Sequence, residues 1–179
     1  MNLAYEAATA DLSDVNMIDP FHLDAYGVTT EIRRVVKPAL DREAQTEAPA
    51  AAMELPDGTI VTARTSDMLG ASSGLLLNAL KKLGGMPDEL HLISPVVLDP
   101  IQKLKTGHLG NRNPRLHTDE TLIALSICAA TNPMAELAMA QLSKLRGCDV
   151  HSSVILSAVD ENTFKRLGIH LTCEPRYKA

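Results

Sequence analysis

Apolar residues in this chain follow two different periods, and these periods alternate from residue 53 to the C-terminus. Apolar residues spaced three and four apart are typical of amphipathic helices, whereas short continuous or alternating apolar runs are typical of strands. The strand-like runs are residues 53–63, 89–97, 150–156 and 169–173. Pro56-Asp57-Gly58 is a turn sequence that divides the first run into a hairpin. The predicted order is therefore β-hairpin, α, β, α, α, α, β, α, β.

This alternation favours one class of fold. Parallel neighbours in a sheet need a crossover connection, which is usually a helix. We therefore predict an α/β domain with a mostly parallel sheet, helices packed on it and a β-hairpin at its start. Residues that can satisfy the free N–H groups of a first helical turn, or place proline there, mark the expected helix starts. These are Ser66, Asp99–Pro100, Thr118, Asn132–Pro133 and Asp160.

The first fifty residues differ from the rest. Residues 1–30 have mixed polar and apolar composition but no obvious partner strands, and residues 31–52 combine mixed charge with a run of alanines. We interpret residues 31–52 as an exposed helix and linker. The α/β domain is predicted to cover residues 53–179, with its boundary near Ala50 to Met53.

Composition narrows the possible functions. With two Phe, three Tyr and no Trp, the core must be aliphatic, and the formal charge of −5 argues against nucleic-acid binding. Three unevenly spaced cysteines suggest neither a disulfide framework nor a metal clip. The N-terminus does not resemble a signal peptide, and the longest apolar stretch, Leu122–Ala130, is too short to span a bilayer. These features predict a soluble cytoplasmic protein with no membrane partner.

The loop from Thr106 to His117 is the first candidate binding site. It is rich in Gly, Asn and Pro and carries a local basic cluster in an acidic protein. It directly precedes a predicted helix N-terminus, where free N–H groups favour an anion. We predict that His108, Asn111, Arg112 and Arg115 contribute to binding a phosphate or carboxylate. The alternative is a solvated connector whose basic groups offset nearby acids.

Serines provide the remaining candidate contacts. Ser72 and Ser73 lie in the small-residue segment LGASSG, and Ser94 lies in the predicted strand at residues 89–97. LGASSG matches neither GxxxxGK[ST] nor GxGxxG, so close packing of helix on sheet is the competing interpretation. No catalytic motif is present, the six histidines lack metal-ligand spacing, and no cofactor is indicated.

Four long runs resemble, in order, the bacterial family catalogued as domain of unknown function 1846. They are NLAYEAATADLSDVNMIDPFHLDAYGVTT, ELPDGTIVTARTSDMLGASSGLLLNALKKLGGMPDELHLISPVVLDPIQKLK, DETLIALSICAATNPMAELAMAQLSKLRGCDVH and LGIHLTCEP. The resemblance implies a longer protein, of which this chain is the C-terminal part. Residues 1–30 resemble the middle of the family sequence, so the upstream half is missing. A further segment that follows the equivalent of Thr29–Thr30 is also missing, which suggests a truncated and internally deleted member.

Two hypotheses about function follow. In the first, the full-length protein binds a nucleotide or phosphorylated small molecule in a cleft between its halves, and this chain alone is inactive. In the second, the domain is a non-enzymatic oligomerisation or scaffold unit. The aliphatic helices near Leu122 to Leu145 are then a subunit contact, and the protein is a homo-oligomer. The same helices could instead form only the core of the domain.

Overall fold

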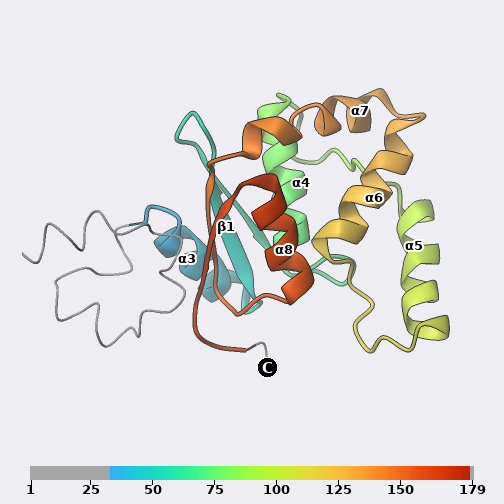
Figure 1. Cartoon of the computed structure of the whole chain (residues 1–179), viewed down its shortest axis with the longest axis horizontal. Helices are drawn as coiled ribbons and strands as arrows, with labels where there is room; N and C mark the ends of the chain where they lie inside the picture. Colours follow the sequence, from blue (N-terminus) through green and yellow to red (C-terminus); the bar gives the residue numbers. More distant parts are fainter. Residues whose placement is uncertain (1–32, 178–179) are drawn as a thin grey trace, which may run out of the picture.

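The computed structural model of the chain describes residues 33–177 (Figure 1). Its elements in chain order are α3 (Val36–Thr46), β1 (Ala50–Glu54), β2 (Ile60–Arg64), α4 (Ala71–Leu83), α5 (Pro95–Lys103), the π-helix η3 (Leu104–His108), α6 (Thr118–Ala129), α7 (Pro133–Met139), the 3-10 helix η4 (Leu142–Leu145), β3 (Asp149–Ser152), α8 (Ala158–Leu167) and β4 (His170–Cys173). The described part is therefore an α/β domain.

The four strands form one sheet in the order β2-β1-β3-β4. β1 is antiparallel to both of its neighbours, and only β3 and β4 pair in parallel. The predicted α/β class and initial hairpin are confirmed, but the prediction of a mostly parallel sheet is wrong. The hairpin is the cause, because its first strand lies inside the sheet and makes two of the three pairings.

The strand predicted at residues 89–97 is absent from the described sheet, and α5 begins there instead. Ser94 accepts a hydrogen bond from the N–H of Val96 at 3.3 Å, and Pro95 occupies the first helical position. Both residues favour a helix start, since proline at that position lacks only an N–H that would have no helical partner. Asp99–Pro100, expected to open the helix, lies inside it.

Other helix starts agree with the sequence to different degrees. Asn132 caps α7 by accepting the N–H of Met134 at 3.0 Å, as predicted. Ser66 does not cap α4, which begins at Ala71. Its hydroxyl instead accepts the N–H of Leu69 at 3.0 Å and closes a local turn between β2 and α4.

β1 is buried on both of its faces. Ala51 and Met53 belong to the main core, which includes the inner side of α4, whereas Ala52 packs with Val35 and Ala39 at α3. This alternation follows from the two-residue period of a strand. α3 and α4 therefore cover opposite faces of the sheet (Figure 1).

Residues 31–52 contain the helix that was expected there, but the structure does not leave it exposed. The N-terminal end of α3 is fixed by Arg33, which donates to Thr172 at 2.6 Å and to Asp149 at 2.8 Å. Its C-terminal half is fixed by Glu43, which forms an ion pair with Arg176 at 2.6 Å. The predictions for residues 1–30 concern a segment outside the described residues, and the proposed domain boundary stays a prediction.

The core is aliphatic apart from Phe164, which is fully buried on α8. α6 contributes Ala124 and Leu125, both with no exposed surface, while Ile123 of the same helix is 60% exposed. Neighbouring residues of α6 therefore have very different environments.

We expect Leu125→Ala to lower the free energy of unfolding by about 2–5 kcal/mol, because it leaves a cavity in a packed core. Val159→Ala on α8 is the control and should change it by less than about 0.5 kcal/mol, because that side chain is 41% exposed. Urea denaturation of both variants measures the difference. Equal losses would show that α6 does not bury the side described here.

Candidate functional site

Three strands end at the same edge of the sheet. β2, β3 and β4 run in one direction, and their last residues are Arg64, Ser152 and Cys173. The register places Ala50, the first residue of β1, opposite Arg64 at this edge. Polar residues that follow the strands can meet here, because ligands of open α/β sheets bind beyond the carboxyl ends of their strands.

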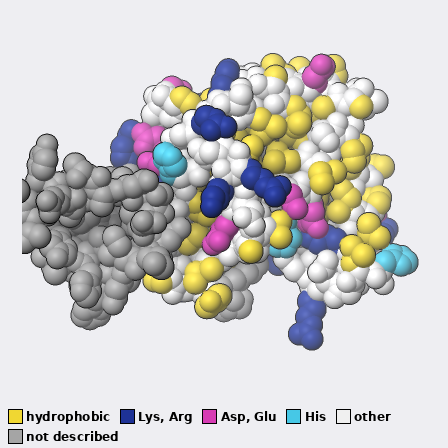
Figure 2. Space-filling model, in the orientation of Figure 1, with side chains coloured by type: hydrophobic (Ala, Val, Ile, Leu, Met, Phe, Trp, Pro, Cys, Tyr) yellow, Lys and Arg dark blue, Asp and Glu magenta, His cyan; other side chains and the backbone are white. Residues whose placement is uncertain are grey.

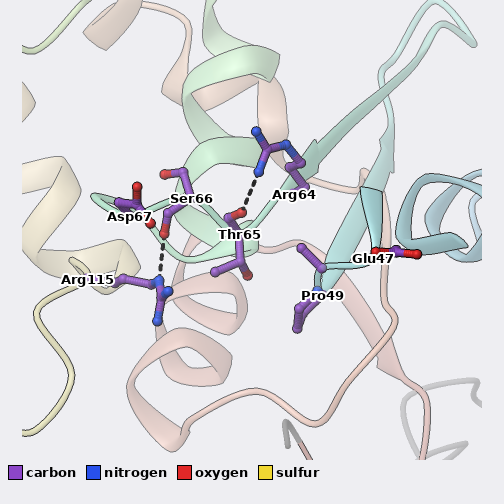
Figure 3. A pocket seen from close by; sticks show the side chains of 8 residues that line it. Glu47, Pro49, Arg64, Thr65, Ser66, Asp67 and Arg115 are labelled. Carbon is purple, nitrogen blue, oxygen red and sulfur yellow. Dashed lines mark hydrogen bonds between the residues drawn. The ribbon is translucent and has the colours of Figure 1, made fainter. Parts of the chain in front are cut away.

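An open pocket of about 440 Å³ lies at this edge beside β2 (Figure 3). It is lined by Glu47, Ala48, Pro49, Arg64, Thr65, Ser66, Asp67 and Arg115. Most of these residues belong to the segments that leave α3 and β2, and Arg115 reaches the pocket from the loop before α6. We call this cavity the edge pocket.

Two arginines give the edge pocket its positive groups. Arg115 Nε donates to the carbonyl oxygen of Ser66 at 2.5 Å, which fixes the guanidinium against the turn after β2. Arg64 Nη1 donates to the carbonyl oxygen of Thr65 at 3.2 Å. Neither arginine forms an ion pair with any residue between 33 and 177. Both therefore have N–H groups left to donate to an anion.

Thr65 adds a hydroxyl to the same pocket. Its backbone N–H donates to the carbonyl of Pro49 at 2.7 Å, and only 9% of the residue is exposed. Its Oγ1 has no hydrogen-bond partner in the part of the chain that the structure describes. Thr65 lines the pocket, so its hydroxyl can form a hydrogen bond with a bound molecule.

Two carboxylates complete the lining. Glu47 ends α3 with a left-handed backbone (φ 52°), and Asp67 lies in the turn after β2. The pocket thus combines donors that suit an anion with acceptors that suit hydroxyl or amine groups.

Lys105 holds Arg115 in place from the other side. The Lys105 side chain is 3% exposed. Its ammonium group donates to the carbonyl oxygen of Arg115 and to Glu120 Oε2, each at 2.6 Å. Glu120 Oε2 also accepts the backbone N–H of His117 at 2.8 Å. The loop between Lys105 and Arg115 is therefore closed at its base.

The structure places only one of the seven predicted contacts, Arg115, in the edge pocket. His108, Asn111 and Arg112 lie exposed in the loop, away from the pocket lining. Ser94 caps α5 and lines a different cavity. Whether any of these residues binds a ligand stays a prediction.

Ser72 and Ser73 lie buried in the first turn of α4. Ser73 Oγ donates to the carbonyl oxygen of Leu116 at 2.9 Å, so it joins α4 to the segment that carries Arg115. Ser72 Oγ has no partner among residues 33–177. The packing interpretation therefore accounts for Ser73.

The sequence did not single out Arg64, Thr65, Asp67 or Glu47. A usable signal was present in Arg64-Thr65-Ser66-Asp67, where a basic residue and hydroxyls follow directly after a strand. The interpretation of Ser66 as a helix cap assigned this segment to a purely structural role.

A serine, a histidine and an aspartate meet where α6 and α8 begin. His117 Nδ1 lies 3.1 Å from Asp160 Oδ2 and 3.3 Å from Ser157 Oγ, and Ser157 Oγ donates to Asp160 Oδ2 at 2.8 Å. Serine and aspartate contact the same ring nitrogen, so the histidine cannot pass a proton between them as in a hydrolase. The cluster acts as a shared helix cap, since Asp160 also accepts the N–H of Thr118 at 2.9 Å.

The cluster changes the pKa of two of its members. The hydrogen bond that His117 donates to Asp160 raises the pKa of His117 above its ordinary 6.5, against the opposing effect of burial. Burial raises the pKa of Asp160, but hydrogen bonds from His117, Thr118 and Ser157 outweigh it and lower that pKa below 3.8. Each member of the pair therefore favours the charged form of the other.

Residues 33–177 contain neither a cluster of metal ligands nor a membrane-spanning helix. No group of three or more His, Cys, Asp and Glu side chains in this part of the chain has a metal-binding arrangement. No helix described here has both the length and the apolar character needed to cross a membrane.

The chain belongs to the family described as Domain of unknown function DUF1846. Residues 31–179 match its C-terminal domain, and residues 1–38 match its N-terminal domain. The resemblance predicted from the sequence is confirmed.

Relatives that match the chain are named UPF0371 protein. The one from Corynebacterium glutamicum (strain R) is 39% identical over 268 residues, which cover 99% of this chain and 54% of the relative. The one from Streptococcus pneumoniae serotype 19F is 37% identical over the same shares. The one from Corynebacterium aurimucosum is 54% identical over 149 residues, or 83% of this chain and 30% of the relative.

The chain spans about half the length of the curated relatives it matches. The match to the Corynebacterium glutamicum protein runs over 268 positions, more than the 179 residues of this chain. That relative therefore carries residues that have no counterpart here. The 149-residue match shows no such excess, which places these additional residues ahead of the C-terminal domain.

We expect the free energy of unfolding to fall as pH rises through the raised pKa of His117. Below pH 6.5 the imidazolium is present in both the folded and unfolded states, so its stabilisation by Asp160 is complete. As pH rises through the folded-state pKa, the folded protein loses this proton and the stabilisation. Urea denaturation from pH 6 to about pH 9 measures the change.

His117→Asn is the control for this prediction. The stability difference between wild type and variant should shrink as pH rises. His151 has a pKa lowered by burial and titrates with the opposite sign, but it is present in both proteins. A stability difference that is constant across this pH range would contradict the charged pair.

Proposed function

We propose that the edge pocket binds the anionic group of a phosphorylated small molecule, and that this domain forms one wall of the site. The observation that carries the proposal is that Arg64, Arg115 and Thr65 line one pocket, and that neither arginine forms an ion pair with a described residue. The position beyond the ends of the strands is where α/β sheets usually bind ligands.

Phosphate fits these donors better than other anions do. A guanidinium presents several N–H groups in one plane and matches the oxygens of a phosphate or carboxylate. A phosphate, with more oxygens, can accept from Arg64, Arg115 and Thr65 together. Two arginines beside one hydroxyl also supply the positive charge that a dianion requires.

The rest of the lining suits a ligand that carries hydroxyl groups. The carboxylates of Glu47 and Asp67 can accept hydrogen bonds from sugar hydroxyls, whereas a second anionic group near them would be repelled. Ala48 and Pro49 offer a small apolar surface for a sugar ring or a base. The ligand class is therefore a sugar phosphate or a nucleotide.

The open shape of the edge pocket indicates that a complete ligand site needs a second wall. Ligand sites usually bury about 70–90% of the ligand surface, which an open edge pocket does not achieve. The match covers only 54% of the Corynebacterium glutamicum relative, and the relatives carry additional residues ahead of this domain. We infer that this additional part closes the site, so the chain by itself binds weakly and is inactive.

We expect sugar phosphates or nucleotides at millimolar concentration to raise the melting temperature of this chain, because ligands that bind the folded state stabilise it. Arg64→Gln and Thr65→Val should each weaken binding by roughly tenfold, since hydrogen bonds to charged groups contribute about 1.5–3 kcal/mol. Arg112→Gln is the control, because it removes the same charge from the exposed loop outside the pocket.

A thermal-shift titration with each ligand measures these effects. Loss of binding in Arg112→Gln with normal binding in Arg64→Gln would show that the ligand binds at the exposed loop before α6 and not in the edge pocket. An unchanged melting temperature of the wild-type chain with every ligand would refute the proposal. The Corynebacterium glutamicum relative should bind the same ligand more tightly, and equal affinity would contradict the second wall.

A further inference from the structure

Exposed apolar side chains are concentrated in one region of the molecule. Nine large hydrophobic residues between 33 and 177 are exposed. Seven of them are Val96, Leu104, Leu109, Ile123, Ile127, Met134 and Leu137. In Figure 2 hydrophobic side chains gather on the half of the molecule that carries α5, α6 and α7. Large apolar clusters on a protein surface usually mark a contact with another molecule.

α6 is apolar on two sides. Its inner side packs into the core, while Ile123 and Ile127, one helical turn apart, are 60% and 56% exposed. On the adjacent α7, Met134 and Leu137 are 40% and 39% exposed. We call these four side chains the α6–α7 face. A surface helix normally has a single apolar stripe, so the second stripe indicates a second packing partner.

A groove lies beside this face. It has a volume of about 380 Å³ and lies between the start of α5 and the end of α6. Its apolar lining is Pro95, Val97, Ile127 and Cys128. A partner side chain could enter the groove while its neighbours cover the α6–α7 face.

The charge pattern indicates what kind of partner fits. No Lys, Arg, Asp or Glu occurs from Thr121 to Ala135, although the chain has a net charge of −5. The center of the surface therefore offers no charge for a charged partner to pair with. Two copies of an acidic chain would normally repel each other, but Ile123, Ile127 and Met134 can meet within this uncharged stretch, and the exposed Glu136 is the first charged residue after it.

The match to the N-terminal domain of the family ends at the start of α3. The N-terminal domain of the family matches residues 1–38, so longer relatives join it to this domain ahead of α3. α3 covers one face of the sheet, and α6 lies beyond α4 on the other side (Figure 1). α6 and α7 thus lie on the opposite side of the sheet from α3, the element at which the N-terminal match ends.

We propose that the α6–α7 face docks onto the same face of a second copy and forms a two-fold symmetric dimer. In such an interface one patch contacts itself, so Ile123 and Ile127 of one protomer pack against α6 of its partner. Antiparallel pairing of the two helices also opposes their dipoles favourably. This surface is separate from the edge pocket and does not depend on ligand binding.

The test compares the oligomeric state of the wild-type chain with that of two variants of matched chemistry. Sedimentation velocity over a micromolar concentration series should show a dimer for the wild type. Ile123→Glu combined with Ile127→Glu should weaken dimerisation at least tenfold, because burying charges in an apolar contact is costly. Val159→Glu is the control, since Val159 is 41% exposed but lies on α8, outside the face.

Circular dichroism and urea denaturation confirm that the variants are folded. A wild-type chain that stays monomeric across the series would overturn the proposal and leave the face to a different protein. A dimer that persists in the Ile123→Glu, Ile127→Glu variant, or is lost in Val159→Glu, would overturn it as well. Dissociation of only the double variant supports it.

Discussion

The burial of β1 on both faces is the constraint on which the rest of the structure depends. Residues Ala50 to Ala52 are three consecutive alanines without exposed surface, and small side chains let α3 approach one face while α4 covers the other. This arrangement places β1 between β2 and β3, which fixes the mixed topology. It also brings the ends of β2 and β3 to one edge, where the pocket lies.

The sequence was informative wherever a short segment determines its own structure. The hairpin, the start of α6 at Thr118 and the start of α7 at Asn132–Pro133 depend on local backbone chemistry and agree with prediction. The parallel sheet was wrong because pairing is decided by distant contacts. An alanine run has the composition of a linker, and only the packing of α3 and α4 shows that it is a central strand.

The same difference separates the correct from the missed parts of the site. Arg115 was identified because it stands in a basic loop directly ahead of a helix, which is a local pattern. Arg64 and Thr65 are recognised as site residues only when residues 47–49, 64–67 and 115 meet at the sheet edge. Sequence spacing alone cannot reveal a pocket built from such distant parts. The apolar helices near Leu122 to Leu145 were recognised, but their exposed second stripe required the structure.

Because Lys105 fixes both ends of the loop before α6, the sequence between these ends can vary without moving Arg115. The Lys105 ammonium group binds the Arg115 carbonyl and Glu120, so residues 109–114 connect η3 to a fixed Arg115. Length and sequence between these anchors can therefore drift during evolution without disturbing the pocket. The same property makes the exposed Asn111 a suitable attachment point for a fluorophore or an affinity tag.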